Sequence, residues 1–191
     1  MRNQCAGVLS PLTEVAGFLL FALLAGTLAA PAPGRAAPAK LHLSSIAFVE
    51  GGFVPARYTC SGANISPALA WSGVPPGARS FVLIVTDPDA PGRTWVHWVA
   101  FNLPANMRSL PERIPKGDEI RGGGAQGVND FRFRGYGGPC PPPGKAHRYF
   151  FRLYALNIRL SLLPGSTKAE VEQSMRSHIL AEGELMARYG R

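Results

Sequence analysis

The sequence has few charged residues, few cysteines and no apolar run of the length that crosses a bilayer. Charged residues make up 17% of the 191 residues and hydrophobic residues 46%, against roughly 25% charged residues in typical soluble domains. This balance excludes a chain that is disordered throughout, because such chains have too little apolar surface to bury. Three cysteines allow at most one intramolecular disulfide and exclude a small fold stapled by several.

Several motifs that carry familiar chemistry are also missing. There is no Gly-x-Ser-x-Gly nucleophile elbow, and the glycines at 122–124 lack the Gly-Lys-Ser/Thr of a phosphate-binding loop. No His-Glu-x-x-His or paired Cys-x-x-Cys occurs, so we predict no metal site and no cofactor. No RNA-binding motif or basic helix is visible, so nucleic acid is not a predicted partner.

The first 39 residues are predicted to be a separate segment. Val15–Ala30 carries no charge, and it is shorter than the roughly 20 residues of a membrane-spanning helix. It fits the apolar region of a signal peptide, with small residues for cleavage after Ala29 or Ala39. A retained membrane anchor is the alternative. We therefore expect a signal peptide and disordered spacer at 1–39, a single domain at 40–191, and a periplasmic or secreted protein with at most peripheral membrane contact.

The remaining chain is basic and rich in turn-forming residues. The full sequence has 20 Lys and Arg against 12 Asp and Glu, for a net charge of +8, which favours an anionic partner. Its 22 glycines and 18 prolines separate short apolar runs, as in a β-rich domain. Two cysteines, Cys60 and Cys140, remain after the leader, and an exported protein favours a disulfide between them. Two buried free thiols are the alternative.

The apolar runs predict a mainly β domain with one helix. Predicted strands cover 41–49, 68–71, 80–86, 95–102 and 148–156, and the run 80–86 is apolar enough to be buried on both faces. Thr167–Glu170 forms a capping box, and the apolar positions Val171, Met175, Ile179 and Met186 predict one helix from there toward the C-terminus. Residues 103–144 read as a long loop, which in a compact domain is usually functional or pinned by contacts.

Polar side chains at the strand ends are the candidates for a ligand site. Asp87 and Asp89 follow a buried strand in the sequence Asp-Pro-Asp-Ala-Pro, and their spacing does not match a calcium loop. A rigid turn with one capping Asp is the alternative. His97 lies inside an apolar strand, where a buried structural histidine is the plain alternative. Alternation places His147 and Tyr149 on one face of their strand, where imidazole and phenol could donate to an anion.

The loop 135–144 is predicted to add backbone donors and positive charge to this site. Its Gly-Tyr-Gly-Gly-Pro-Cys-Pro-Pro-Pro-Gly sequence is stiff and could offer N–H groups to an anion. Five basic residues are expected to bracket the site: Arg132, Arg134, Lys145, Arg148 and Arg152. A solvated basic face is the alternative interpretation.

Together these segments resemble the phosphatidylethanolamine-binding protein family, in its bacterial Raf-kinase-inhibitor-like branch. The resemblance spans roughly residues 43–191. It rests on 60–71, the Asp-Pro-Asp-Ala-Pro segment with Trp-Val-His-Trp after it, the Gly-Pro-Cys-Pro-Pro loop with His-Arg-Tyr after it, and the tail 178–191.

The resemblance implies a β-sandwich of two sheets with a C-terminal helix, long loops and a small anion pocket. It implies ligand contacts from Asp87, His97, His147 and Tyr149, with backbone from Gly138, Pro139 and Cys140. In that family's pockets the Ala90-Pro91 turn is strained and its peptide bond can be cis.

The predicted function is therefore that of an exported binding protein for phosphate or phospholipid head groups. No activated nucleophile is visible among these residues, so we predict that it is not an enzyme. One alternative is a protein-interaction module that inhibits a protease or kinase through the loop 108–134. Another is a hydrolase or lyase that uses Asp87 and a histidine as acid and base. The natural ligand and the oligomeric state do not follow from the sequence.

Overall fold

The computed structural model describes residues 39–191. The signal peptide and spacer expected at 1–39 therefore lie outside the described residues, apart from Ala39. No helix within 39–191 is long and apolar enough to cross a membrane.

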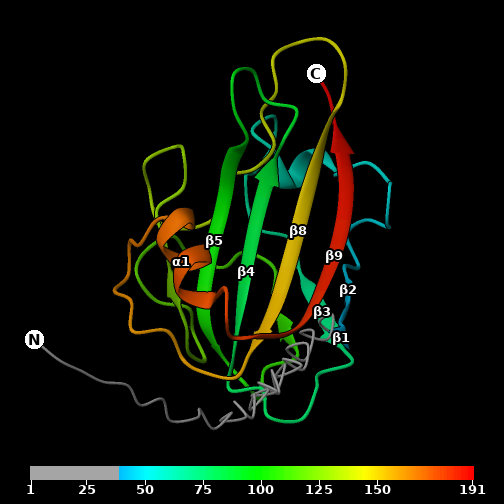
Figure 1. Cartoon of the computed structure of the whole chain (residues 1–191). Coiled ribbons are helices and arrows are strands. Elements are labelled where there is room, and N and C mark those ends of the chain that lie inside the picture. Colours follow the sequence, from blue (N-terminus) through cyan, green and yellow to red (C-terminus); the bar gives the residue numbers. More distant parts are fainter. Residues whose placement is uncertain (1–38) are drawn as a thin grey trace, which may run out of the picture. The chain divides into compact units, whose positions relative to one another are not determined.

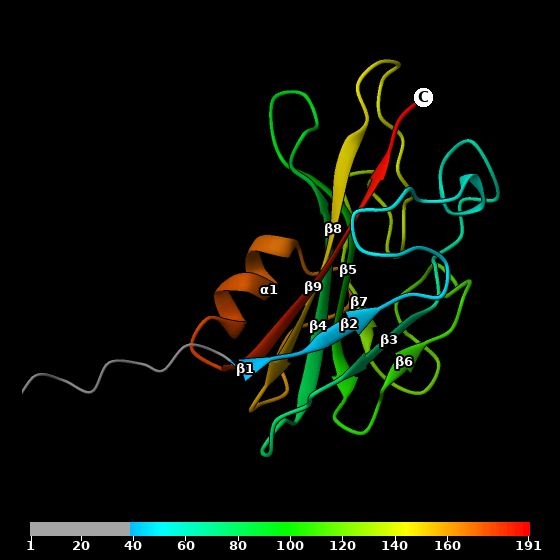
Figure 2. The ribbon, with the colours of Figure 1, turned by 90° about the vertical axis from the view of Figure 1, so that its right-hand side faces the viewer.

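The described chain forms two β-sheets and one α-helix. The larger sheet has the order β1-β9-β8-β4-β5-β7 and the smaller one β2-β3-β6. The α-helix α1 and the small sheet cover opposite faces of the large sheet (Figure 2). The elements are β1 Ala39–Lys40, β2 His42–Ser44, η1 (a 3-10 helix) Ala56–Tyr58, β3 Leu69–Ser72, β4 Ser80–Asp87, β5 Trp95–Pro104, β6 Ser109–Leu110, β7 Ala125–Gln126, β8 His147–Leu156, α1 Lys168–Met175 and β9 Ile179–Tyr189. This confirms the mainly β sandwich.

The core lies on both faces of β4, the central strand of the large sheet (Figure 1). All eight residues of β4 are buried, as its apolar sequence predicted. Phe81, Leu83 and Val85 pack into the core between the two sheets. Val82 and Ile84 belong to a second core that also includes residues of α1. Because β4 is fixed on both faces, its last residue, Asp87, has a rigid support.

The predicted C-terminal helix is much shorter than expected. The capping box is confirmed, since the Thr167 side chain and Glu170 cap each other at the start of α1. However, the helix ends at Met175, and Ile179–Tyr189 form β9, so the helical prediction for Ile179 and Met186 is wrong. Residues at alternate positions are buried in β9, which is the two-residue period of a strand.

Small residues explain why this strand was missed. Three of the buried positions in β9 are Ala181, Gly183 and Ala187, which give a weak hydrophobic signal. A Cβ atom on Gly183 would come within 2.5 Å of the carbonyl oxygen of Leu41, so the small residues let the chain pack closely here. Pairing with β8 along ten register positions outweighs the local helical pattern.

Two other predicted segments differ in detail. The strand expected at 41–49 is confined to β2, with β1 just before it. The long loop expected at 103–144 begins two residues later, because β5 runs to Pro104, and it contains the two-residue strands β6 and β7. Contacts within the chain pin it: Ile114 N–H donates to Ser66 Oγ at 2.8 Å, and Gln126 Nε2 donates to the Pro115 carbonyl at 2.9 Å.

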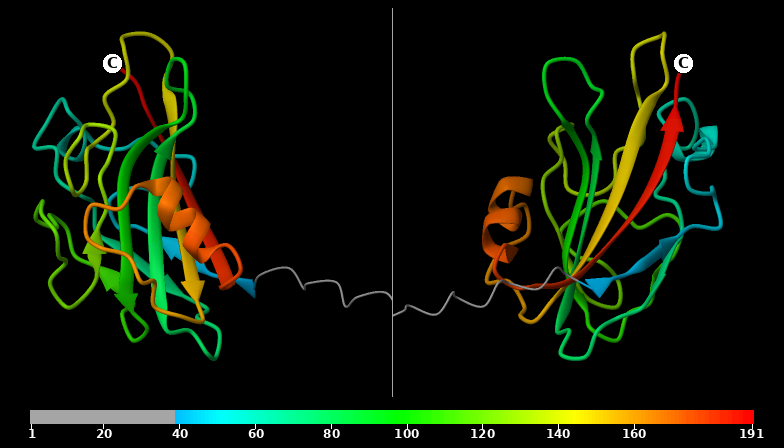
Figure 3. Two further views of the ribbon diagram at one scale, coloured as in Figure 1. Left: turned by 60° about the vertical axis from the view of Figure 1, so that its left-hand side comes forward. Right: turned by 45° about the vertical axis from the view of Figure 1, so that its right-hand side comes forward.

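One end of the large sheet gathers the segments that matter for a site. The β4–β5 connection, the loop before β8 and the end of β9 all lie at this end (Figures 1 and 3). Asp87 pairs with Trp95 across β4 and β5, and His147 pairs with Tyr189 across β8 and β9. Sheet topology thus brings together segments that are 60 residues apart in the sequence.

Candidate functional site

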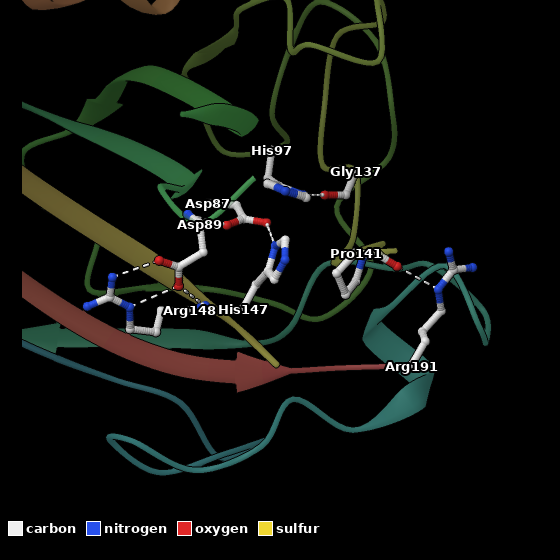
Figure 4. A network of polar contacts seen from close by, with 8 residues as sticks. All are labelled: Asp87, Asp89, His97, Gly137, Pro141, His147, Arg148 and Arg191. Atoms are coloured by element: carbon white, nitrogen blue, oxygen red, sulfur yellow. Dashed lines mark hydrogen bonds and ion pairs between the residues drawn. The ribbon is translucent and has the colours of Figure 1, made fainter. Parts of the chain in front are cut away.

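Asp87 is buried at the end of β4 and orients two partners. Its exposed fraction is 3%. The carboxylate oxygen Oδ1 accepts the backbone N–H of Asp89 at 2.8 Å, and Oδ2 lies 2.8 Å from Nδ1 of His147 (Figure 4). Both carboxylate oxygens are therefore used, and a buried carboxylate with such partners is a fixed acceptor. Asp87 therefore orients His147.

His147, at the start of β8, is held with one ring nitrogen free. Because the Asp87 carboxylate accepts, Nδ1 of His147 carries the hydrogen that it donates. The other nitrogen, Nε2, is left for a ligand, and His147 lines a cavity beside Asp87. Its side chain is 12% exposed, so a ligand can reach it while most of the ring is fixed.

His97 has a different environment from His147. It is 2% exposed, and its Nδ1 lies 2.6 Å from the carbonyl oxygen of Gly137 (Figure 4). A carbonyl only accepts, so Nδ1 carries the hydrogen. Burial lowers the pKa of His97, which favours the neutral ring. Nε2 of neutral His97 is then an acceptor, so this residue suits a ligand O–H or N–H rather than the bare anionic oxygen expected from the sequence.

Tyr149 lies behind these residues and does not line the cavity. Its ring meets that of His97 edge-on at 5.2 Å, and its side chain is fully buried. Its hydroxyl has no hydrogen-bond partner within residues 39–191. Burial, and after it the Asp87 carboxylate, raise the pKa of Tyr149, so the hydroxyl keeps its proton. Tyr149 therefore supports His97 and lies beside the cavity.

The cavity itself is small and has mostly apolar walls. Its volume is about 180 Å³. Asp87, His97 and His147 are the polar side chains that line it, and the remaining lining residues are Ala90, Pro91, Trp95, Phe131, Cys140, Pro141 and Pro142. Such a site combines apolar walls with a few convergent polar groups, which is the usual composition of a ligand pocket.

Two aromatic walls were missed by the sequence analysis. Trp95 and His97 are two residues apart in β5, so the two-residue period of a strand could have predicted that they share a face. Phe131 gave no such signal, because it lies in the long loop. The side chain of Asn129 bridges Phe133 N–H and the Gly135 carbonyl. This turn brings Phe131 within 5.5 Å of Trp95 and 5.4 Å of His97, between ring centres.

The loop predicted to cradle an anion contributes less than expected. The N–H of Gly138 donates to Asn64 Oδ1 at 2.7 Å, so it is not free for a ligand. Pro139 has no N–H, and its carbonyl accepts from Cys60 N–H at 3.0 Å. Only Cys140 of these three residues lines the cavity. The predicted Cys60–Cys140 disulfide is present, with Cα atoms 5.3 Å apart.

The expected bracket of five basic residues is wrong. None of them lines the cavity. Three of them pair with acids that are distant in sequence: Arg134 with Asp118, Arg148 with Asp89, and Arg152 with Glu184. Strand alternation points Arg148 and Arg152 to the face of β8 opposite His147 and Tyr149. Residues 39–191 also contain no cis peptide bond, so the Ala90-Pro91 bond is trans.

The fold and the site together define a class of protein: a β-sandwich with a small pocket at one end of the large sheet, with mostly apolar walls and three polar side chains. The sequence model described as "Phosphatidylethanolamine-binding protein" matches residues 44–190. The chain belongs to this family, which supports a binding-protein fold.

Relatives of known sequence and structure agree with this assignment. A UPF0098 protein of Methanothermobacter thermautotrophicus is 49% identical over 151 residues, which are 79% of this chain and 99% of the relative. One from Aquifex aeolicus is 46% identical over 80% of this chain and 90% of the relative.

Two solved structures are also similar. The crystal structure titled as a putative phosphatidylethanolamine-binding protein homolog, CT736 of Chlamydia trachomatis, has a TM-score of 0.72 and 41% identity, and covers 80% of this chain and 98% of its own. E. coli YbcL, described as a new member of the mammalian PEBP family, has a TM-score of 0.73 and 35% identity, over 80% of this chain and 99% of its own.

Proposed function

We propose that this protein is an exported binding protein whose pocket takes phosphate or phospholipid head groups. The observation that carries the proposal is the pairing of Asp87 with His147 at 2.8 Å beside a cavity of about 180 Å³. With the Asp87 carboxylate at Nδ1, Nε2 is the nitrogen that faces the ligand, and an N–H there would donate to an anionic oxygen.

The second histidine narrows the chemistry of the ligand. Neutral His97 presents an acceptor, so it pairs with a P–OH group of a singly charged phosphate or with an ammonium N–H. A phosphoethanolamine head group offers both an anionic oxygen for His147 and an ammonium for His97. The apolar walls formed by Trp95 and Phe131 then suit the methylene groups of the same ligand.

Binding without catalysis is part of the proposal. The side chains that line the cavity include no serine, threonine, lysine or free thiol, because Cys140 is in the disulfide. An acid–base reaction by Asp87 and a histidine would need the Asp87 carboxylate to be free, whereas both of its oxygens hold neighbours. The inhibitor alternative stays a prediction from the loop 108–134.

Titration calorimetry with phosphate and with phosphoethanolamine tests the proposed function. His147→Ala removes the donor while leaving the buried carboxylate in place. Loss of one hydrogen bond to a charged group predicts binding weaker by at least about tenfold. His42→Ala is the matched control, since His42 is exposed in β2 of the small sheet. Its affinity should equal that of the wild type.

Equal affinity of His147→Ala and the wild type would contradict the proposed pocket. Thermal unfolding of each variant shows whether the fold is intact, so a misfolded variant is not counted as loss of binding. A screen of phosphate and carboxylate esters that revealed turnover dependent on His97 or His147 would contradict the absence of catalysis.

A further inference from the structure

A second, basic groove lies on the other face of β8 from the pocket. Its volume is about 490 Å³, and it is lined by Phe53, Asp89, Lys145, Ala146, Arg148 and Arg188. Alternation along the strand places His147 on the inner face and Ala146 and Arg148 on the outer face. Neighbouring residues of the chain therefore serve different cavities: His147 lines the pocket, and Ala146 and Arg148 line the groove.

The two carboxylates of the Asp-Pro-Asp motif serve these two sites separately. Asp87 holds His147 in the pocket. Asp89 accepts Nε of Arg148 at 2.9 Å and Nη2 at 2.7 Å, and it also accepts the backbone N–H of Arg148 at 2.9 Å (Figure 4). This network fixes the Arg148 guanidinium and lowers the pKa of Asp89 to about 2. Nη1 of Arg148 remains available at the groove.

The groove carries positive charge that the described chain does not neutralise. Arg188 lies directly opposite Arg148 in the β8–β9 register, an arrangement that repels unless an anion lies between the two side chains. Within residues 39–191, neither Arg188 nor Lys145 has an acidic partner within ion-pair distance. One acid, Asp89, thus faces three basic side chains.

Exposed apolar side chains gather in the segment that leads to this groove. Five large hydrophobic side chains are exposed in residues 39–191, and three of them are in one short segment: Ile46 at 96%, Val49 at 73% and Phe53 at 65%. The segment runs along β9, where Val54 N–H donates to the Arg188 carbonyl and Arg188 N–H donates to the Gly52 carbonyl, both at 2.8 Å. Phe53 is paired with Arg188 and lines the groove.

We propose that this face docks onto a bilayer containing anionic phospholipids. Basic side chains attract lipid phosphates, while neighbouring aromatic and aliphatic side chains enter the interfacial region. Phe53 at the groove, with Ile46 and Val49 exposed in the same short segment, favours this occupant over an acidic polypeptide, which would supply carboxylates but no apolar layer. The proposal does not rest on the head-group pocket, since none of the groove side chains reaches that cavity.

Vesicle sedimentation with the unit Ala36–Arg191 tests the docking face. These residues form a compact unit of their own, and a relative that is matched over 99% of its length by 151 residues consists of such a domain alone. The vesicles are mixtures of phosphatidylcholine and phosphatidylglycerol, compared with pure phosphatidylcholine. Each basic side chain at a bilayer contributes about fivefold to binding. Lys145→Ala with Arg188→Ala should therefore weaken binding about 25-fold, and Phe53→Ser should weaken it as well.

The matched control removes the same charge from a different groove. Arg121→Ala with Arg159→Ala also lowers the net charge by two, and these residues line a groove with the glycines at 122–124. Its binding should change less than about threefold, because distant charges are screened by salt. Equal losses in the two double variants would overturn the proposal, as would equal wild-type binding to the uncharged vesicles. If the protein bound polyglutamate but no vesicles, the partner of this face would be an acidic polypeptide, and the proposal would be overturned as well.

Failure of the pocket and failure of the groove are distinguishable. His147→Ala should bind these vesicles like the wild type, and the Lys145→Ala, Arg188→Ala double variant should bind soluble phosphate like the wild type. If His147→Ala abolished vesicle binding and the double variant did not, the docking face would be wrong and the pocket alone would bind lipid.

Discussion

At the residue scale, two histidines of the same sequence character have different chemistry because of their neighbours. A carboxylate holds Nδ1 of His147 and a carbonyl holds Nδ1 of His97. The first neighbour is an acidic side chain and the second is backbone, and burial lowers the pKa of His97 and favours its neutral ring. The pocket therefore presents two histidine Nε2 atoms in different surroundings.

The pH dependence of stability tests the state of His97. A lowered pKa in the folded protein means that the unfolded chain binds the proton first as the pH falls below about 6.5. Stability is then present above that pH and is lost below it. Urea unfolding should show that proton uptake by His97 in the unfolded chain lowers the free energy of unfolding by up to about 1 kcal/mol between pH 7 and pH 5.5. His97→Asn keeps a donor for the Gly137 carbonyl and should lack this part of the loss. An unchanged pH dependence in this variant would contradict the neutral ring.

The convergence of Asp87, His97 and His147 was implied by the family resemblance of the motifs that carry them, whereas the strand patterns alone do not show which segments meet. The roles of Tyr149 and of Gly138 could not be predicted, since they depend on which neighbour takes each hydrogen bond. Phe131 was missed because a loop has no period from which its direction could be deduced.

At the element scale, the two-residue alternation of side chains along a strand predicted their directions correctly, whereas helical spacing did not predict β9. Alternation placed His147 and Tyr149 on one side of β8 and Arg148 on the other. The helical stripe failed in β9, where Ala181, Gly183 and Ala187 are buried but carry little apolar surface. The partners of Arg134, Arg148 and Arg152 could not be predicted either, because the paired acids come from other elements.

The disulfide links two such elements and should contribute strongly to stability. It joins the segment after η1 to the pocket wall across a sequence separation of 80. Closing a loop of that size is worth about 4 kcal/mol in the chain-entropy model. Cys60→Ser with Cys140→Ser should lower the free energy of urea unfolding by that order, relative to the oxidised wild type. Thiol labelling of the denatured, unreduced unit Ala36–Arg191 should find no free thiol. Two labelled cysteines would show that the bond is absent.

At the scale of the whole molecule, the net charge of +8 does not gather at the pocket. Several of the basic side chains form ion pairs. Three basic side chains line the outer groove at β8 and β9: Lys145, Arg148 and Arg188, of which Arg148 also pairs with Asp89. The anionic partner that the basic sequence favours stays a prediction. The proposals place anion contacts on two different surfaces, the pocket at His147 and the groove at Arg188.

Export is a prediction that concerns the whole chain. We propose cleavage after Ala29, because cleavage after Ala39 would remove one of the two residues of β1, which pairs with β9. Expression of the full chain in a bacterial host, followed by fractionation and intact mass measurement, should recover a periplasmic or secreted form that begins at Ala30. A full-length form retained with the membrane would show that the segment is an anchor.

A crystal structure of the protein grown with phosphate is the most direct test of the pocket. The account predicts a phosphate with one oxygen within hydrogen-bond distance of His147 Nε2, a second oxygen at His97 Nε2, and Trp95 and Phe131 against its open side. A phosphate that occupied only the outer groove, with the cavity beside Asp87 holding water alone at saturating ligand, would contradict it.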